Sequence, residues 1–177
     1  ETTIDESSMR VAGGKGFGKC AGYIFGKNIA KKSSNESEKM AMTAPVRSVG
    51  ETTNSEKMAM TAPVRSLGNQ KSGKTKISFV IGSKYNLQNV PKPIDSDVKV
   101  KKVDGHYLAC TSFSGPPPTD ERIGKERDAI LQTLANEGIR ARGDKEVIVY
   151  GYHDPIITPN ILRKNEVAVM VDGSSLN

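Results

Sequence analysis

The segment SEKMAMTAPVRS occurs twice, at residues 37–48 and 55–66, and it constrains the fold more than any other feature of the chain. In both copies the methionines alternate with other residues at a period of two, which places them on one face of a β-strand. The copies are joined by VGETTN, a short glycine-containing stretch typical of a loop. We therefore predict a β-hairpin with strands at 39–44 and 57–62. A recent local duplication without structural consequence would leave the same repeat.

Further segments are rich in β-branched and aromatic residues or alternate in polarity, and two others have the pattern of helices. The predicted strands, after a first one at ETTI, are 76–82, 98–103, 106–115, 146–153 and 165–172. From Thr119, an N-cap residue, an early pair of acids and a terminal Gly138 predict a helix. Residues 13–26 have a second helical pattern, although each internal glycine costs about 1 kcal/mol against alanine.

The order of these elements predicts the fold class. Counting the strands at 98–103 and 106–115 as a hairpin, each half of the chain resembles a β-α-β-β unit. We therefore expect an α+β domain of two pseudo-twofold halves, with two helices flanking a curved antiparallel sheet that closes into a distorted β-barrel. The length of 177 residues suits a single domain over 1–177.

Composition restricts the functional classes. No stretch approaches the about 20 apolar residues that a membrane span requires. The chain opens on ETTI without a methionine, so we expect a processed or trimmed form, from which a targeting peptide would leave no trace. The net charge of +6 favours anionic partners. The basic residues are scattered and no aromatic-basic string accompanies them, so we expect no nucleic-acid partner.

The two cysteines are expected to be free thiols. Cys20 and Cys110 both lie in apolar surroundings and neither belongs to a CxxC pair. We therefore expect buried thiols and no metal or redox site built on sulfur.

One face of the first predicted helix is poor in side chains. At 100° per residue, Gly14, Gly18, Ala21, Gly22 and Phe25 form a single stripe. A flat surface that ends in an aromatic ring can receive a planar macrocycle. Close packing of the helix on a sheet would require the same small residues, and the pattern by itself does not separate the two interpretations.

Several motifs together resemble the SOUL heme-binding family. They are GYIFGKN (22–28), KMAMTAPV (39–46 and 57–64), FSG (113–115), GYHDP (151–155) and RKNEV (163–167). Their order and spacing match across nearly the whole chain. The opening ETT and the FGKN segment look most like the plant and algal branch directed to plastids. Family members usually have a strand reading Y-E-x-R before ETT, and its absence here leaves one barrel strand in question.

The resemblance implies a shallow hydrophobic site for heme or a related tetrapyrrole against the first helix, so it favours the ligand interpretation of the stripe. Mammalian members carry basic residues on this helix for the ligand's carboxylates, and the matching positions here are Gly14 and Gly22. Lys15, Lys19 or Lys27 can substitute for them from neighbouring positions. The loop after GYHDP borders the pocket by resemblance, which adds Ile157 and Arg163 as binding candidates.

The sequence gives no strong ligand for iron. Heme iron usually takes an axial His, Cys, Met or Tyr, and the two histidines are His106 and His153. Because His153 lies in GYHDP it is the axial candidate, although a single histidine is more often a surface residue. The repeat offers thioethers that more often pack in a core: Met40, Met42, Met58 and Met60. We expect weak or absent protein ligation of the iron.

The leading hypothesis is a carrier, buffer or scavenger of heme or chlorophyll precursors in the plastid, or otherwise in the cytoplasm, with a possible peripheral association with lipid bodies. The alternative is an enzyme, either a heme-dependent oxidase or peroxidase or a tetrapyrrole-degrading enzyme, for which no catalytic constellation is recognisable. A ligand-sensing regulatory domain has similar architecture, but no DNA-binding helix-turn-helix is attached.

Overall fold

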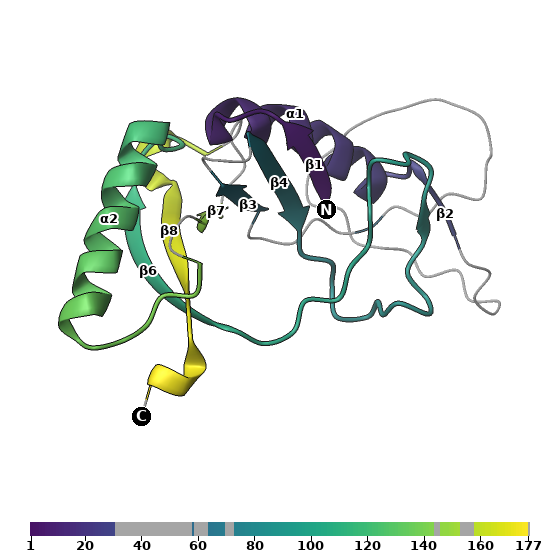
Figure 1. Cartoon of the computed structure of the whole chain (residues 1–177). Helices are drawn as coiled ribbons and strands as arrows, with labels where there is room; N and C mark the ends of the chain where they lie inside the picture. The colour runs from purple at the N-terminus through teal and green to yellow at the C-terminus, as the bar shows by residue number, and fades with distance from the viewer. Residues whose placement is uncertain (31–57, 59–63, 70–72, 144–145, 153–157, 177) are drawn as a thin grey trace.

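The computed structural model describes residues 1–30, 58, 64–69, 73–143, 146–152 and 158–176. Its elements follow the chain in this order: β1 (Thr2–Asp5), α1 (Met9–Ile24), β2 (Asn28–Ile29), β3 (Val64–Asn69), β4 (Lys74–Phe79), β5 (Lys92–Pro93), β6 (Tyr107–Ser114), α2 (Asp120–Asn136), β7 (Glu146–Gly151), the 3₁₀ turn η1 (Asn160–Leu162), β8 (Lys164–Val171) and the 3₁₀ turn η2 (Gly173–Ser175). The described part of the chain is thus a mixed α+β fold (Figure 1).

Six of the strands form one antiparallel sheet with the order β1-β4-β3-β7-β8-β6. In the first half, β4 pairs with both β1 and β3; in the second half, β8 pairs with both β6 and β7. The halves join through β3 and β7, whose register runs from Val64 opposite Gly151 to Asn69 opposite Glu146. Each half contributes a β-α-β-β unit, so the predicted doubled architecture is confirmed for these elements.

Both helices cover the same face of the sheet. Helix α1 contacts β4, β1 and β3, and α2 contacts β8, β6 and β7. The main hydrophobic core lies between the helices and this face, and it joins Met9 of α1 to Ile123 and Ile130 of α2 over Val147 and Val167. This burial orders α1, whose own composition makes it a poor helix.

Helix α1 begins four residues earlier than the sequence pattern predicts. Ser8 has an extended backbone and its side chain accepts a hydrogen bond from Val11 N–H, as an N-cap residue does. The helix ends at Ile24, and Gly26 follows it with φ of 115°, a conformation that side chains disfavour. Helix α2 begins after Thr119, as predicted. The side chain of Thr119 accepts a hydrogen bond from Arg122 N–H.

One glycine of α1 is required by close packing on the sheet. A Cβ atom at Gly16 would lie 2.4 Å from Ile77 Cγ1 and 2.7 Å from Ile77 Cβ on β4. At Gly13, Gly14 and Gly18 a Cβ atom would meet nothing within 4 Å. The packing explanation therefore accounts for Gly16 but not for Gly13, Gly14 and Gly18.

The predicted strand at 98–103 is wrong. Val98 makes an isolated bridge to Thr2, and Lys99 N–H donates to Glu1 O at 2.8 Å, after which residues 99–105 run without regular structure. The alternation that suggested a strand reflects burial of Val98 and partial burial of Val100. Strand β6 therefore has β8 as its neighbour, and the predicted hairpin of 98–103 with 106–115 does not form.

The closed barrel is also not observed. The described strands form an open sheet with β1 and β6 at its edges, and a small separate pair, β2 and β5, which the sequence did not predict. The hairpin predicted at 39–44 and 57–62 lies outside the described residues except for Met58, which is buried and donates its N–H to Ile24 O at 2.7 Å.

The two cysteines are free, as predicted, but only one is buried. Cys20 is 3% exposed and lies against β4, where its thiol donates to Ile77 O. Cys110 is exposed on β6, so the expectation of burial is wrong for this residue. Desolvation raises the pKa of both thiols, which keeps them protonated near neutral pH.

Candidate functional site

A cleft of about 400 Å³ opens between the N-terminal halves of the two helices, above the junction of β3 and β7. We call it the helix cleft. Its described lining residues are Met9, Arg10, Gly13, Gly14, Phe17, Val64, Ser66, Pro117, Pro118, Ile123, Val149, Gly151, Tyr152, Arg163, Lys164 and Asn165. The cleft therefore lies where the two halves of the fold meet.

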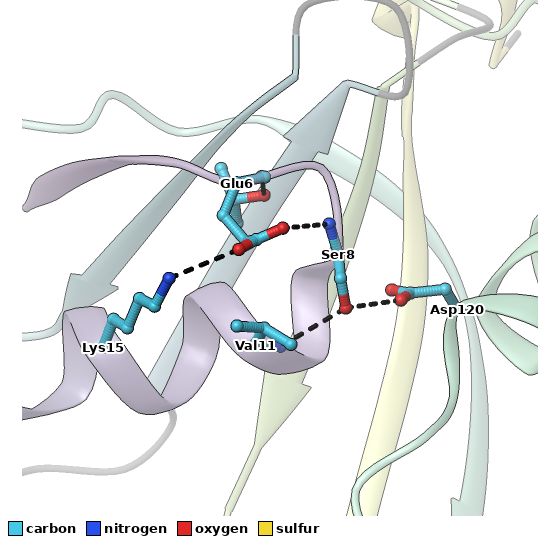
Figure 2. Close-up of polar contacts among 6 residues, drawn as sticks. Glu6, Ser8, Val11, Lys15 and Asp120 are labelled. Carbon is cyan, nitrogen blue, oxygen red and sulfur yellow. Dashed lines mark hydrogen bonds and ion pairs between the residues drawn. The ribbon is translucent and has the colours of Figure 1, made fainter.

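A polar junction holds the helix N-termini together beside the cleft (Figure 2). Asp120, the first residue of α2, accepts hydrogen bonds from Ser8 Oγ at 2.6 Å and from Met9 N–H at 2.9 Å. Glu6 accepts from Ser8 N–H and pairs with Lys15 Nζ at 3.3 Å. The carboxylate of Asp120 thus caps α1 from another helix, where the positive end of the helix dipole favours an anion.

The walls of the cleft are mostly apolar. Phe17 stands on α1 with its ring centroid 5.2 Å from that of Phe79, and Val64 and Val149 contribute from the adjacent strands. On the α1 side, Gly13 and Gly14 present backbone without side chains. A flat apolar ligand can therefore approach this helix closely.

The segment that leads into α2 closes the opposite wall. Asn165 is 5% exposed, and its amide nitrogen donates to Gly115 O at 2.9 Å and to Pro116 O at 3.4 Å. This contact holds Pro117 and Pro118, which line the cleft, against the start of β8. The buried amide therefore has a positioning role at this wall.

Two arginines contribute positive charge to the lining. Arg10 projects from the exposed side of α1, and Arg163 lies before β8 with its Nε–H donating to Thr158 O at 2.7 Å. Guanidinium groups bind carboxylates through paired hydrogen bonds. The cleft thus combines an apolar interior with cations suited to an acidic substituent.

At the end of β7, Tyr152 donates a short hydrogen bond to Glu166, which also accepts from Ser112 Oγ at 2.9 Å and pairs with Lys164 Nζ at 2.7 Å. Burial and the bond to Glu166 raise the pKa of Tyr152 well above its usual value. Partial burial opposes ionisation of Glu166, but the bonds from Lys164, Tyr152 and Ser112 outweigh it and lower its pKa. The phenol remains a proton donor to a carboxylate.

Comparison with known proteins identifies the family. The family model described as SOUL heme-binding protein matches residues 48–170, more than half of the chain. The chain belongs to the SOUL heme-binding protein family. No curated protein matches the chain significantly. The matched residues include the strands of the helix cleft, the start of α2 and Arg163, whereas α1 precedes them.

The SOUL resemblance inferred from the motifs is therefore confirmed, and members of this family are heme-binding proteins. The structure brings some of the predicted residues together and separates others. Gly14 and Arg163 line the helix cleft. Gly18 lies one turn beyond Gly14 on the same stripe, and Ala21, Gly22 and Phe25 lie farther along α1, outside the cleft lining.

The far end of the stripe has its own surroundings. Ala21 is buried, Phe25 is 57% exposed, and a Cβ atom at Gly22 would meet the side chain of Lys27 at 3.1 Å. Lys19 pairs with Asp97 at 2.5 Å, which raises the pKa of the lysine through that hydrogen bond. His153 and Ile157 lie outside the described residues, so their predicted roles remain predictions.

Sequence reasoning missed Arg10, Gly13 and Phe17 as cleft residues. The pattern of the helix was read from residue 13, so Arg10 was placed before it. Phe17 lies off the predicted side-chain-poor stripe, and the structure places its partly buried ring at the cleft wall. The N-cap Ser8 was the available signal for an earlier helix start.

The cleft fits the ring and acidic groups of a heme better than its iron. Among the described lining residues, the candidate axial donors are Met9 and Tyr152. The sulfur of Met9 packs against β3, where a Cβ atom at Gly68 would lie 2.8 Å from it, and the hydroxyl of Tyr152 is bonded to Glu166. Both donors are therefore already engaged in contacts within the protein.

No helix among the described residues is long and apolar enough to cross a membrane.

Proposed function

We propose that the chain binds heme or a related tetrapyrrole in the helix cleft and acts as a carrier, buffer or scavenger of this ligand. The observation that supports the proposal most directly is the cleft itself, which lies at the junction of the two halves in a chain of a heme-binding family. Its volume of about 400 Å³ lies within the range of small-molecule pockets.

The cleft residues have separable roles in this proposal. Gly13 and Gly14 allow the ring to lie against the α1 backbone, and Phe17 packs against the ring edge. Arg10 and Arg163 bind the ligand's carboxylates, which replaces the basic helix residues of the mammalian members. The apolar floor formed by the adjacent strands excludes water from the ring face.

The helix stripe predicted from the sequence remains a candidate extension of this site. Gly14 belongs to both the stripe and the cleft, and at Gly18 the space above the backbone is open. We propose that a bound ring extends from the cleft over Gly18, with Gly22 and Phe25 beyond it on the same side of α1. Variants at Gly18 test this extension separately from the cleft.

We propose weak or absent axial ligation by the protein, with His153 as the candidate if an axial ligand is supplied. Heme, when bound, supplies an iron centre that exogenous ligands can reach. The chain's own contribution is then to bind the ring and neutralise its carboxylates. The alternative function, a heme-dependent oxidase or peroxidase or a tetrapyrrole-degrading enzyme, predicts turnover of hemin-loaded protein with peroxide or a reductant, whereas a carrier predicts none.

The cleft is tested by Gly14→Leu, with Gly124→Leu in α2 as the matched control. At both positions a Cβ atom would meet nothing within 4 Å, and both substitutions improve helix propensity by somewhat less than about 1 kcal/mol. Only Gly14 lines the cleft. Hemin titrations should show at least a tenfold loss of affinity for Gly14→Leu, about 1.4 kcal/mol, and no loss for Gly124→Leu.

Thermal unfolding of the same two variants separates ligand exclusion from damage to the fold. We expect the melting temperature of both to hold or rise. Unchanged hemin affinity in a folded Gly14→Leu protein would remove the cleft from consideration. A parallel loss in Gly18→Leu would show that the ring reaches the stripe beyond it.

The plastid location is likewise a proposal, supported by the resemblance of the opening residues and of the FGKN segment to the plastid-directed branch. Imaging a fluorescent fusion of the protein as its gene encodes it tests the location, and signal confined to the cytoplasm would contradict it.

A further inference from the structure

A second hollow of about 570 Å³ lies beside the ends of β3, β4 and β7, with residues 80–103 forming much of its wall. We call it the strand groove; its floor includes Arg65 of β3, Ser78 of β4 and Tyr150 of β7. Their strand neighbours Val64 and Val149 line the helix cleft instead. Because successive side chains of a strand point to opposite faces, the polar floor of the groove and the floor of the helix cleft lie on opposite faces of β3 and β7. The groove also reaches the C-terminal half of α1, where Cys20, Tyr23 and Ile24 line it.

The floor of the groove is a row of directly opposed polar residues. Ser78 is opposite Arg65, and Arg65 is opposite Tyr150. The same row continues to Glu166 and Ser112 on the next two strands. Residues directly opposite each other lie about 4.5–5.5 Å apart at their Cβ atoms, so one small polar group can reach several of them.

One nitrogen of the half-buried Arg65 guanidinium lacks a partner. Its Nε atom is buried and has no hydrogen-bond acceptor among the described residues. No carboxylate of the described residues forms an ion pair with this side chain. A buried donor without an acceptor is costly, and an anion in the groove would satisfy it.

The charge around the groove favours the same sign of ligand. Lys99, Lys101 and Lys102 also line the groove, and the acidic residue among the described lining, Glu1, is paired with Lys101 at 2.6 Å. The lining is therefore net cationic. Burial raises the pKa of Tyr150, although Arg65 opposes the shift, so the phenol remains a hydrogen-bond donor.

Most of the remaining lining is apolar, apart from Asn86 and His106. Partly buried Phe79, Ile81 and Tyr85 and buried Val90 and Val98 belong to a second hydrophobic cluster at this place. An occupant must therefore have an apolar body as well as an anionic group. The volume is sufficient for a molecule of small-ligand size.

We propose that the strand groove is a second ligand site, which binds a small carboxylic acid with an apolar chain. The carboxylate accepts hydrogen bonds from Arg65 and Tyr150, and the chain lies along the apolar wall. No described lining residue is shared with the helix cleft. The two sites are therefore lined by different described residues, and this proposal goes beyond the proposed tetrapyrrole site.

Laurate is the probe, and isothermal titration calorimetry is the measurement. Arg65→Met removes the guanidinium, while Lys76→Met is the matched control because Lys76 is an exposed cation two residues before Ser78 on the same face of β4 and does not line the groove. We expect saturable laurate binding to the wild type. The dissociation constant should be at least tenfold larger for Arg65→Met and should change by less than twofold for Lys76→Met. Dodecanol, which lacks the carboxylate, should bind much more weakly than laurate.

A competition experiment distinguishes a fatty carboxylate in the groove from the acidic groups of a tetrapyrrole. Protein saturated with hemin should still bind laurate with unchanged affinity, and Gly14→Leu should not affect it. Displacement of laurate by hemin, or equal laurate binding by wild type and a folded Arg65→Met, would overturn the proposal. So would the absence of saturable binding to the wild type.

A measurement on the wild-type protein covers the case in which Arg65→Met does not fold. Carbon-13 NMR of carboxyl-labelled laurate reports the ionisation of the bound ligand directly. Contact with Arg65 should lower the pKa of the bound carboxyl below that of free laurate. A bound carboxyl with an unshifted or raised pKa would contradict the proposed contact.

Discussion

The cap that joins the two helices gives a prediction that can be worked through from the contacts. In Asp120→Ala, α1 loses the acceptor for Met9 N–H and the partner of Ser8 Oγ. Loss of an N-cap acceptor costs about 0.5–2 kcal/mol, and a hydrogen bond to a charged group contributes about 1.5–3 kcal/mol. Both contacts are at least partly exposed, so we expect a total of about 2 kcal/mol in the free energy of unfolding.

The neighbouring residue supplies the control. Glu121 also lies in the first turn of α2, so Glu121→Ala removes the same favourable charge at that helix end without touching α1. Urea unfolding should show Asp120→Ala less stable than Glu121→Ala by at least about 1 kcal/mol, and a double-mutant cycle with Ser8→Ala should show a coupling of about 0.5 kcal/mol or more. Equal stabilities of the two alanine variants would refute the role of Asp120 as a cap from another helix.

The same substitution connects the cap to the ligand. Met9 and Arg10 line the helix cleft from the first turns of α1, and Ile123 lines it from α2. When Asp120 no longer ties the helix ends, these walls lose a fixed separation. We therefore expect hemin affinity to fall in Asp120→Ala and to be retained in Glu121→Ala. Both affinities are measured without urea, at a temperature at which both variants are fully folded.

Three further expectations test the fold and its electrostatics. Gly16→Ala should lower stability by about 1–3 kcal/mol because its Cβ atom would collide with β4, whereas Gly18→Ala should raise it by up to about 1 kcal/mol; equal effects would contradict the packing. The lowered pKa of Glu166 means that its contribution to stability is present above the ordinary glutamate pKa of about 4.3 and is lost as the pH falls through the folded-state value. The free energy of unfolding of Glu166→Gln should therefore fall less steeply with falling pH in this range than that of the wild type. An unchanged pH profile would exclude the contribution of Glu166. Thiol titration of denatured, unreduced protein should find both Cys20 and Cys110 free, and a count near zero would reveal a disulfide.

The doubled β-α-β-β order could be predicted from local patterns because each element carries its own signal. Helix α2 has an N-cap, early acids and a regular apolar stripe, and the two C-terminal strands alternate or run apolar as strands do. The segment 98–103 shows the same alternation, but its pairing with the described strands is limited to the bridge from Val98 to Thr2. Its alternation therefore reflects alternating burial and not a strand. A single sequence does not show which pattern finds a pairing partner.

The helix glycines show a second limit of sequence reasoning. Gly14 and Gly16 are two residues apart on the same helix, and the sequence does not distinguish them. In the structure, Ile77 occupies the space above Gly16, whereas Gly14 lines a cleft. Their difference depends on the rotation of α1 over β4, which follows from long-range packing. Arg65 is a similar case, because its lack of an acceptor depends on strands that are distant in the sequence.

The junction of β3 and β7 lies against both proposed sites, and the topology explains why. In each β-α-β-β unit, the first strand of the six-stranded sheet after the helix has one edge that no strand of its own half pairs. These strands are β3 and β7, and their pairing with each other joins the two halves into one sheet. On the helix side, the two helices diverge from their capped N-termini and leave this pair uncovered at the cleft. On the other side, the same strands present Arg65 and Tyr150, so alternation gives one face an apolar floor and the other a cationic one. A ligand on either face contacts residues of both halves, and its binding energy therefore also stabilises the junction between them.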